Sequence, residues 1–159
     1  MVKLILGVVI ILTTTVLGKK VTDKFHHKLK YYECLKRFNL YLKQNMLHKR
    51  DILVNLLDFK CENQDFSATL SSIKLKILQL SESCIYLPYW ADEDDKTYLN
   101  EYFLSLGKNN SLAEIEFITA QEEIINEKVL KIADKNSKFL NLGQKLGLAV
   151  GIAVFIIIL

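Results

Sequence analysis

The sequence predicts an all-α protein, a small helical bundle that lies between an N-terminal and a C-terminal transmembrane helix. Two observations predict this fold class. Proline occurs once and glycine six times in 159 residues, and so few helix breakers favour long helices over many short strands. Apolar residues also recur at helical spacing in most segments, whereas no segment sustains the strict alternation that is typical of a half-buried strand.

Residues 1–18 are the first segment expected to enter a membrane. A run of 15 residues without charge, 4–18, follows Lys3, although a spanning helix usually needs about 20 apolar residues. A cleavable signal peptide is the alternative, because one lysine, a short apolar core and small residues also form its pattern. We favour an uncleaved anchor, since a second hydrophobic segment closes the chain.

Residues 19–141 are predicted to form a helical domain. An apolar stripe from Leu29 to Met46 predicts a helix that continues from the first segment, and a short helix is expected at 51–59. A third helix is predicted from apolar residues spaced by four and three: Phe66, Leu70, Ile73, Ile77, Leu80 and Cys84. The acidic run 92–95 opens a fourth helix, which Gly107 ends.

The last third of the chain, residues 111–159, predicts one long helix that is amphipathic first and apolar at its end. Ser111 and Glu114 have the spacing of a capping box. Apolar residues then occupy every seventh position: Ile118, Ile125, Ile132, Phe139 and Leu146. No charge follows Lys145, so we place a C-terminal transmembrane segment at residues 142–159.

Lysines gather beside both membrane segments, on the side that faces the middle of the chain. They are Lys19, Lys20, Lys24, Lys28 and Lys30 after the first segment, and Lys131, Lys135, Lys138 and Lys145 before the charge-free run that ends the second. The positive-inside rule then places the middle in the cytoplasm and both short termini on the far side. Three widely separated cysteines, Cys34, Cys61 and Cys84, fit reduced core thiols in that compartment.

No catalytic, cofactor or metal site is predicted. The acidic run Asp92–Asp95 lacks the alternating ligands and central glycine of a calcium loop, and acids at a helix start are its simpler explanation. His26, His27 and His48 have no cysteine or acid at a zinc spacing. A net charge of +3 without a basic face that interleaves aromatic residues argues against nucleic acid. An enzyme therefore has no local motif in its favour.

Small residues mark one face of the C-terminal segment. Gly143, Gly147 and Gly151 recur at every fourth position, and overlapping Gly-x-x-x-Gly pairs permit close contact between membrane helices. The alternative is that small residues are simply common in such helices. The contacting helix is either the N-terminal anchor, where Gly7 offers a complementary gap, or a second copy of the chain.

Both ends of the chain share residues with a known family. The first segment ends on Leu17 and Gly18; in the last third the matching residues are Leu104, Leu106, Gly107, Lys135, Lys138, Leu142, Gly143 and Gly147. In these residues, and in its layout, the chain resembles the stage III sporulation protein AB family. It departs from that family at Asn109, Asn110 and Glu114, where a Ser-Asp pair and a Gln are usual, and at 47–49, where a Thr-Pro turn is expected.

The resemblance implies a non-enzymatic platform subunit of a secretion-like complex that joins mother cell and forespore during sporulation. The soluble domain of that family is similar to the cytoplasmic domains of platform proteins of type II secretion and type IV pilus systems, which dock a hexameric ATPase. The implied partners are the bilayer, other subunits of the channel complex and such an ATPase, at the mother-cell membrane. The alternative function is a secreted or surface-exposed helical protein that is held by a C-terminal membrane tail.

Overall fold

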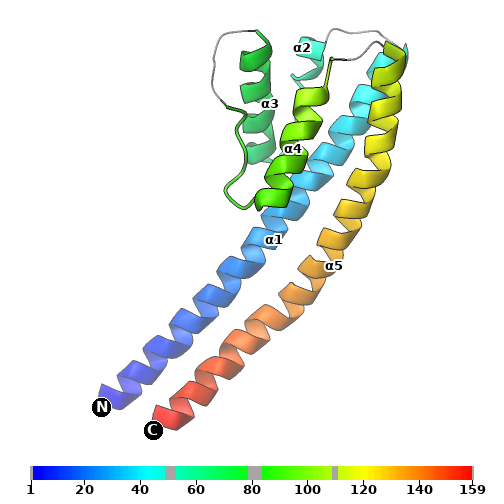
Figure 1. Ribbon diagram of the computed structural model, residues 1–159. Helices are drawn as coiled ribbons and strands as arrows, with labels where there is room; N and C mark the ends of the chain where they lie inside the picture. The colour runs from blue at the N-terminus through cyan, green and yellow to red at the C-terminus, as the bar shows by residue number, and fades with distance from the viewer. Residues whose placement is uncertain (1, 49–52, 79–83, 109–110, 159) are drawn as a thin grey trace. The chain divides into compact units, whose positions relative to one another are not determined.

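The computed structural model describes residues 2–48, 53–78, 84–108 and 111–158, and all of its regular secondary structure in these ranges is helical (Figure 1). The predicted all-α class is confirmed. The helices are α1 (Val2–His48), α2 (Leu53–Leu56), α3 (Gln64–Ile77), α4 (Glu93–Ser105) and α5 (Ser111–Ile158). The two longest therefore begin and end the described chain.

The chain divides into two compact units. One, called the bundle below, is Lys30–Val129; the other, called the terminal unit, is Met1–Leu29 together with Leu130–Leu159. Helices α1 and α5 contribute to both units, whereas α2, α3 and α4 belong to the bundle alone. The bundle is thus three short helices added to one section of a long helix pair.

Helix α1 confirms the prediction that the first apolar stripe continues from the N-terminal segment without a break. No glycine or proline follows Gly18 within it, so nothing interrupts its hydrogen-bond ladder. In the bundle its inner face is fully covered. The residues on this face that have no exposed surface are Tyr31, Tyr32, Leu35, Phe38 and Leu42.

Helix α2 is shorter than the predicted segment 51–59, of which Asp51 and Ile52 lie outside the described residues. The amide of Leu57 still donates to the carbonyl of Leu53, but the amide of Asp58 donates to Asn55, three residues back. This tighter pattern closes the last turn and ends the helix.

Helix α3 also ends early, at Ile77, so the prediction of a helix through Cys84 is wrong. Phe66 and Ile73 are buried as predicted. Ile77 is 41% exposed, so at this position the apolar stripe no longer packs against the bundle. Leu80 lies outside the described residues, and where the description resumes, at residue 84, the chain is not helical and contacts α3. The amide of Tyr86 donates to Ser72 Oγ at 3.0 Å, and Trp90 is fully buried.

The ends of α3 and α4 follow their sequences. Asn63 caps α3 by accepting from the amide of Phe66 at 2.9 Å, and Asp92 caps α4 by accepting from the amide of Asp95 at 2.9 Å. The predicted acidic helix start is confirmed. After α4, Gly107 has φ +75°, a conformation that glycine adopts without strain, and a Cβ there would lie 2.7 Å from Leu53 Cδ2.

The membrane helices expected at residues 1–18 and 142–159 are not shown. Across the described ranges, the helices do not combine the length and the apolarity that a membrane crossing requires. These two segments, and the boundaries that they set for the domain at 19–141, stay predictions.

Candidate functional site

The glycines predicted to mark a helix contact lie in regular helix. Gly143, Gly147 and Gly151 belong to α5, and Gly7 belongs to α1. What surrounds these four positions lies outside what the structure describes. The predicted helix contact therefore stays a prediction.

The first turn of α4 places an acid inside the bundle. Asp95 is 4% exposed, and its Oδ1 accepts a hydrogen bond from the hydroxyl of Tyr32 on α1 at 2.8 Å. Burial, followed by the negative charge of Asp95, raises the pKa of Tyr32 far above its usual value. Tyr32 therefore stays a neutral donor, and its bond to Asp95 ties α1 to α4.

A lysine of α5 lies near the rings of Tyr32 and of Tyr98 on α4. The Nζ of Lys128 lies 4.3 Å from the ring centroid of Tyr98 and 5.9 Å from that of Tyr32, within the range of cation–π attraction. The hydroxyl of Tyr98 donates to Gln121 Oε1 at 2.9 Å. Burial raises the pKa of Tyr98. Helices α1, α4 and α5 thus meet at one stacked Tyr32–Tyr98 pair.

A buried asparagine joins the same three helices at a second level. Asn39 on α1 donates through Nδ2 to the carbonyl of Ile118 on α5 at 3.0 Å, and its Oδ1 accepts from the hydroxyl of Tyr102 on α4 at 2.9 Å. Asn39 and Tyr102 are each 1% exposed, and burial raises the pKa of Tyr102. A buried group with all these partners fixes the register of its helices.

Helix α3 is attached to α1 by a third polar contact. The hydroxyl of Tyr31 donates to Thr69 Oγ1 at 3.0 Å, and burial raises the pKa of Tyr31. Trp90 packs edge-on against Tyr31 with ring centroids 5.1 Å apart, and its indole N–H donates to Asp65 Oδ2 at 3.3 Å. The hydroxyl and indole groups of these buried rings therefore each have a polar partner elsewhere in the bundle.

These six residues are called the polar seam below: Tyr31, Tyr32, Asn39, Thr69, Asp95 and Tyr102. Sequence reasoning missed the seam, although one signal was present. Asn39 falls on the buried stripe of α1, four residues after Leu35 and three before Leu42. A polar residue at an inward position predicts a buried partner. The hydrogen bonds of the seam run between helices, so its role is to hold the helices in position.

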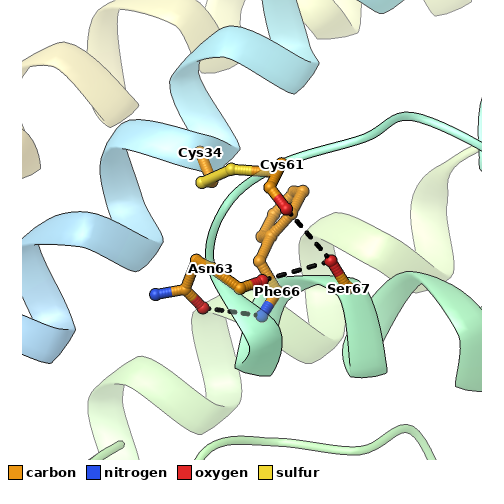
Figure 2. Close-up of a disulfide and its surroundings, with 5 residues drawn as sticks. All are labelled: Cys34, Cys61, Asn63, Phe66 and Ser67. Atoms are coloured by element: carbon orange, nitrogen blue, oxygen red, sulfur yellow. Dashed lines mark hydrogen bonds between the residues drawn. A yellow bond between two sulfur atoms is a disulfide. The ribbon is translucent and has the colours of Figure 1, made fainter.

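The expectation of reduced core thiols is wrong for two of the three cysteines, because Cys34 and Cys61 form a disulfide (Figure 2). Cys34 lies on the buried face of α1, and Cys61 lies in the connection before α3. Their Cα atoms are 6.2 Å apart, which is within the range that a disulfide spans. The remaining cysteine, Cys84, is free and exposed rather than a core thiol.

The residues around the disulfide fix the start of α3 (Figure 2). Ser67 Oγ donates to the carbonyl of Asn63 at 3.2 Å and to that of Cys61 at 3.5 Å. Asn63 caps the helix beneath Phe66, whose ring is fully buried. Three cysteines allow at most one pair within the chain and leave at least one thiol unpaired, and a separation of 27 residues gives no hint of contact. The sequence therefore favours reduced thiols and does not indicate this pairing.

Two shallow grooves occur on the described surface of the bundle. One, of about 290 Å³, lies between α1 and α5, and one of about 270 Å³ lies between α4 and α5. The first mixes both signs of charge: its lining is Glu33, Lys36, Arg37, Leu40, Glu122 and Val129. Beside it, Lys43 Nζ pairs with Glu122 Oε2 at 2.7 Å. Charge compensated within the groove gives it no marked preference for an anion or a cation.

No metal centre is assembled in the part of the chain that the structure describes, where no three potential ligands gather. His26 and His27 are exposed, and the side chain of His48 lies outside the described residues. Within the acidic run, Asp92 serves as a helix cap and Asp95 as an acceptor for Tyr32. These two acids therefore have structural roles.

Comparison with known proteins gave no relative: no family model, curated protein or solved structure matches the chain.

Proposed function

We propose that this chain is a membrane-anchored, non-enzymatic platform subunit of a secretion-like sporulation complex, and that its bundle docks a cytoplasmic ATPase. In this proposal residues 1–18 and 142–159 cross the mother-cell membrane and the bundle faces the cytoplasm. The resemblance of both chain ends to the stage III sporulation protein AB family suggests the complex. The arrangement of the helices supports a membrane-anchored platform subunit.

One observation carries the proposal: α1 and α5, of 47 and 48 residues, each contribute to both compact units. Their bundle sections supply Asn39 and Ile118 to the polar seam's contacts, and their outer sections hold the charge-free apolar runs. Each of the two helices is continuous, so the bundle is joined by the chain itself to the helices that would sit in the membrane. A platform requires this connection.

The polar seam makes the bundle suitable for docking. Asn39 and Tyr102 fix the relative register of α1, α4 and α5. A partner therefore meets a surface that is already ordered. Less binding free energy is then spent on ordering the bundle when the complex forms. The exposed side chains of the bundle would supply that surface.

Purification of the intact membrane protein from sporulating cells tests the proposal. We expect a secretion-type hexameric ATPase to be recovered with the wild-type chain. We expect its yield to fall when the register of the bundle is disturbed by Asn39→Leu, and to be retained in Asn136→Leu, which changes a buried asparagine outside the bundle. Full recovery of the membrane protein without the ATPase, under conditions that retain other subunits, would contradict docking.

One observation favours the second candidate, a secreted or surface-exposed helical domain held by a C-terminal membrane tail. Disulfides such as Cys34–Cys61 persist mainly in oxidising compartments. In this alternative residues 1–18 are a cleaved signal peptide. Mass spectrometry of the mature N-terminus separates the candidates: a chain that begins at Met1 fits the platform, and a chain that begins near Lys19 fits the surface protein.

A further inference from the structure

The two cysteines of the disulfide differ in their exposure to solvent. Cys34 lies on the buried face of α1 and is 6% exposed, whereas Cys61 lies in the connection before α3 and is partly exposed (Figure 2). Its chain neighbours Lys60 and Glu62 are both exposed. A thiol that reduces a disulfide must reach one of its two sulfur atoms. The fold therefore leaves Cys61 as the cysteine that a reductant can reach.

The disulfide ties the start of α3 to α1 where polar contacts between helices are sparse. In the part of the chain that the structure describes, one side-chain hydrogen bond joins α3 directly to another helix, from Tyr31 on α1 to Thr69. By contrast, α4 bonds to α1 at two levels of the polar seam. The cap of α3 at Asn63 lies within its own segment. Reduction therefore leaves α3 helical but removes the covalent link that holds its start against α1.

Asp65, in the first turn of α3, connects this start to residues 84–91. Its Oδ2 accepts a hydrogen bond from the indole N–H of Trp90 at 3.3 Å, and its Oδ1 accepts one from the hydroxyl of Tyr86 at 3.1 Å. Trp90 is the only tryptophan of the chain and has no exposed surface, whereas Tyr89 is 77% exposed. A displacement of Asp65 therefore changes the surroundings of Trp90 and the connection that carries the exposed Tyr89.

We propose that Cys61 is a redox-modification site, at which a dithiol protein of the thioredoxin class opens the disulfide and so releases the start of α3 together with the connection 84–91. This inference does not rest on the proposed function, because both cysteines lie in the bundle whichever side of a membrane it faces. In a reducing compartment the released form is the resting state, and oxidation closes the switch. In an oxidising compartment the closed form is the resting state.

The exchange conserves atoms and electrons. A thiolate of the reductant attacks Cys61 Sγ, the disulfide bond of the chain breaks, and its electron pair leaves on Cys34, which takes a proton from water. The second thiol of the reductant loses its proton and attacks the reductant sulfur of the mixed disulfide. Cys61 then leaves as a thiolate and takes a second proton. The chain gains two electrons and two protons, and the reductant becomes a disulfide. An oxidised dithiol protein drives the same steps in reverse.

A trapping experiment identifies the attacked sulfur. The full-length chain is purified in mild detergent with Cys84→Ser, which removes the free thiol. It is mixed with a thioredoxin whose second active-site cysteine is replaced by serine, so that the mixed disulfide accumulates. We expect mass spectrometry to find the adduct on Cys61 in about tenfold or greater excess over Cys34. An adduct mainly on Cys34, or no adduct in the absence of denaturant, would overturn the proposal.

Hydrogen exchange tests whether reduction acts locally. Residues 31–42 of α1 are held by the polar seam and report the opening of the whole bundle. After reduction by intact thioredoxin, amide exchange in residues 61–69 should accelerate about tenfold more than exchange in residues 31–42. Equal acceleration in the two segments would show that the disulfide only stabilises the bundle as a whole, and it would overturn the proposal.

The emission of Trp90 tests the connection to residues 84–91. Reduction should shift this emission to longer wavelength, because the indole loses its buried surroundings. Asp65→Ala removes the acceptor of the indole N–H and should make the shift on reduction smaller. The matched variant Asp58→Ala removes an acid that pairs with Lys74 of α3, and it should keep the full shift. Unchanged emission after complete reduction, or the same shift in both variants, would overturn the release of this connection.

Discussion

The bundle and the terminal unit are built on the same two helices, but their side chains differ in kind. All seven tyrosines and the one tryptophan lie in the bundle, where hydroxyl and indole groups bond across helices. The sequence of the terminal unit is aliphatic, with lysines and only two acids. One section of each helix is thus specified by directional contacts and the other by apolar surface and charge.

This difference shows how a long helix serves two roles. Directional hydrogen bonds at Asn39 and Tyr102 select one arrangement of neighbouring helices, because any shift leaves buried polar groups unsatisfied. An aliphatic face without such bonds tolerates sliding and rotation. Substitutions that probe polar or aromatic anchoring should therefore act on the bundle much more than on the terminal unit.

The largest difference in stability between the bundle and the terminal unit is expected at alkaline pH. Burial raises the pKa values of Tyr31, Tyr32, Tyr98 and Tyr102. The folded bundle therefore holds these protons more tightly than the unfolded chain, whose tyrosines titrate near 10. The stability they contribute is complete below about pH 10 and is lost as the pH rises above it. We expect the bundle to unfold cooperatively in that range, as measured by near-ultraviolet circular dichroism.

Tyrosinate absorbance checks this prediction in the same titration. The part of it that comes from Tyr31, Tyr32, Tyr98 and Tyr102 should rise together with the loss of the near-ultraviolet signal rather than before it. Part of the helical signal should persist, because the terminal unit contains no tyrosine. Ionisation of the buried tyrosines near pH 10 without unfolding would contradict the burial that the structure assigns to them.

Two adjacent aromatic residues of the bundle provide the next test. Trp90 has no exposed surface and packs against Tyr31, whereas its neighbour Tyr89 is 77% exposed. Trp90→Ala should lower the free energy of unfolding by about 3–5 kcal/mol, and Tyr89→Ala should change it by less than about 0.5 kcal/mol. Denaturant unfolding of the full chain in detergent measures both. Similar effects at the two positions would be inconsistent with the packing.

The disulfide should contribute slightly less to the free energy of unfolding than Trp90 does. Cys61→Ser opens a loop that spans 27 residues and should reduce stability by about 3 kcal/mol, because the unfolded chain regains the freedom that the crosslink removed. Cys84→Ser is the control, since Cys84 is free and exposed. Reductant should destabilise the wild-type chain and the control, but it should leave Cys61→Ser unchanged. An effect of reductant on Cys61→Ser would refute this explanation.

A pair of buried asparagines gives the smallest but most specific contrast. Asn39 in the bundle bonds to Ile118 and Tyr102, whereas in the described structure Oδ1 of Asn136, in the terminal unit, has no hydrogen-bond partner. Asn39→Leu should cost about 2 kcal/mol, because it leaves a buried carbonyl and a buried hydroxyl without partners. Asn136→Leu should be neutral or stabilising. Equal costs, measured by thermal unfolding, would remove the contrast between the two units.

The sequence was sufficient to predict the helices that its apolar periodicity defines. The long helices α1 and α5 were predicted as continuous, and the start of α4 at its acids and its end at Gly107 were also predicted. The extension of α3 to Cys84 failed, because the period of its apolar residues continues beyond the point where α3 has a buried face. Periodicity shows which residues share a face, and only tertiary packing shows where that face ends.

The polar seam and the disulfide could not be predicted in the same way. Both join residues that are far apart in the chain: 63 residues separate Tyr32 from Asp95, and 27 separate Cys34 from Cys61. Local spacing contains no information on such pairs. The inward position of Asn39 was a usable signal for a buried partner, but nothing in the sequence identified Ile118 and Tyr102 as those partners.

The side of the membrane that the bundle occupies is the central point of the proposed function, and Cys84 reports it directly. This thiol is free and exposed, so a membrane-impermeant maleimide labels it only from its own side. A cysteine added after Leu159 in a Cys84→Ser chain reports the opposite side. In intact cells we predict that the added cysteine is labelled and that Cys84 is labelled only after permeabilisation. Labelling of Cys84 in intact cells would contradict a cytoplasmic platform.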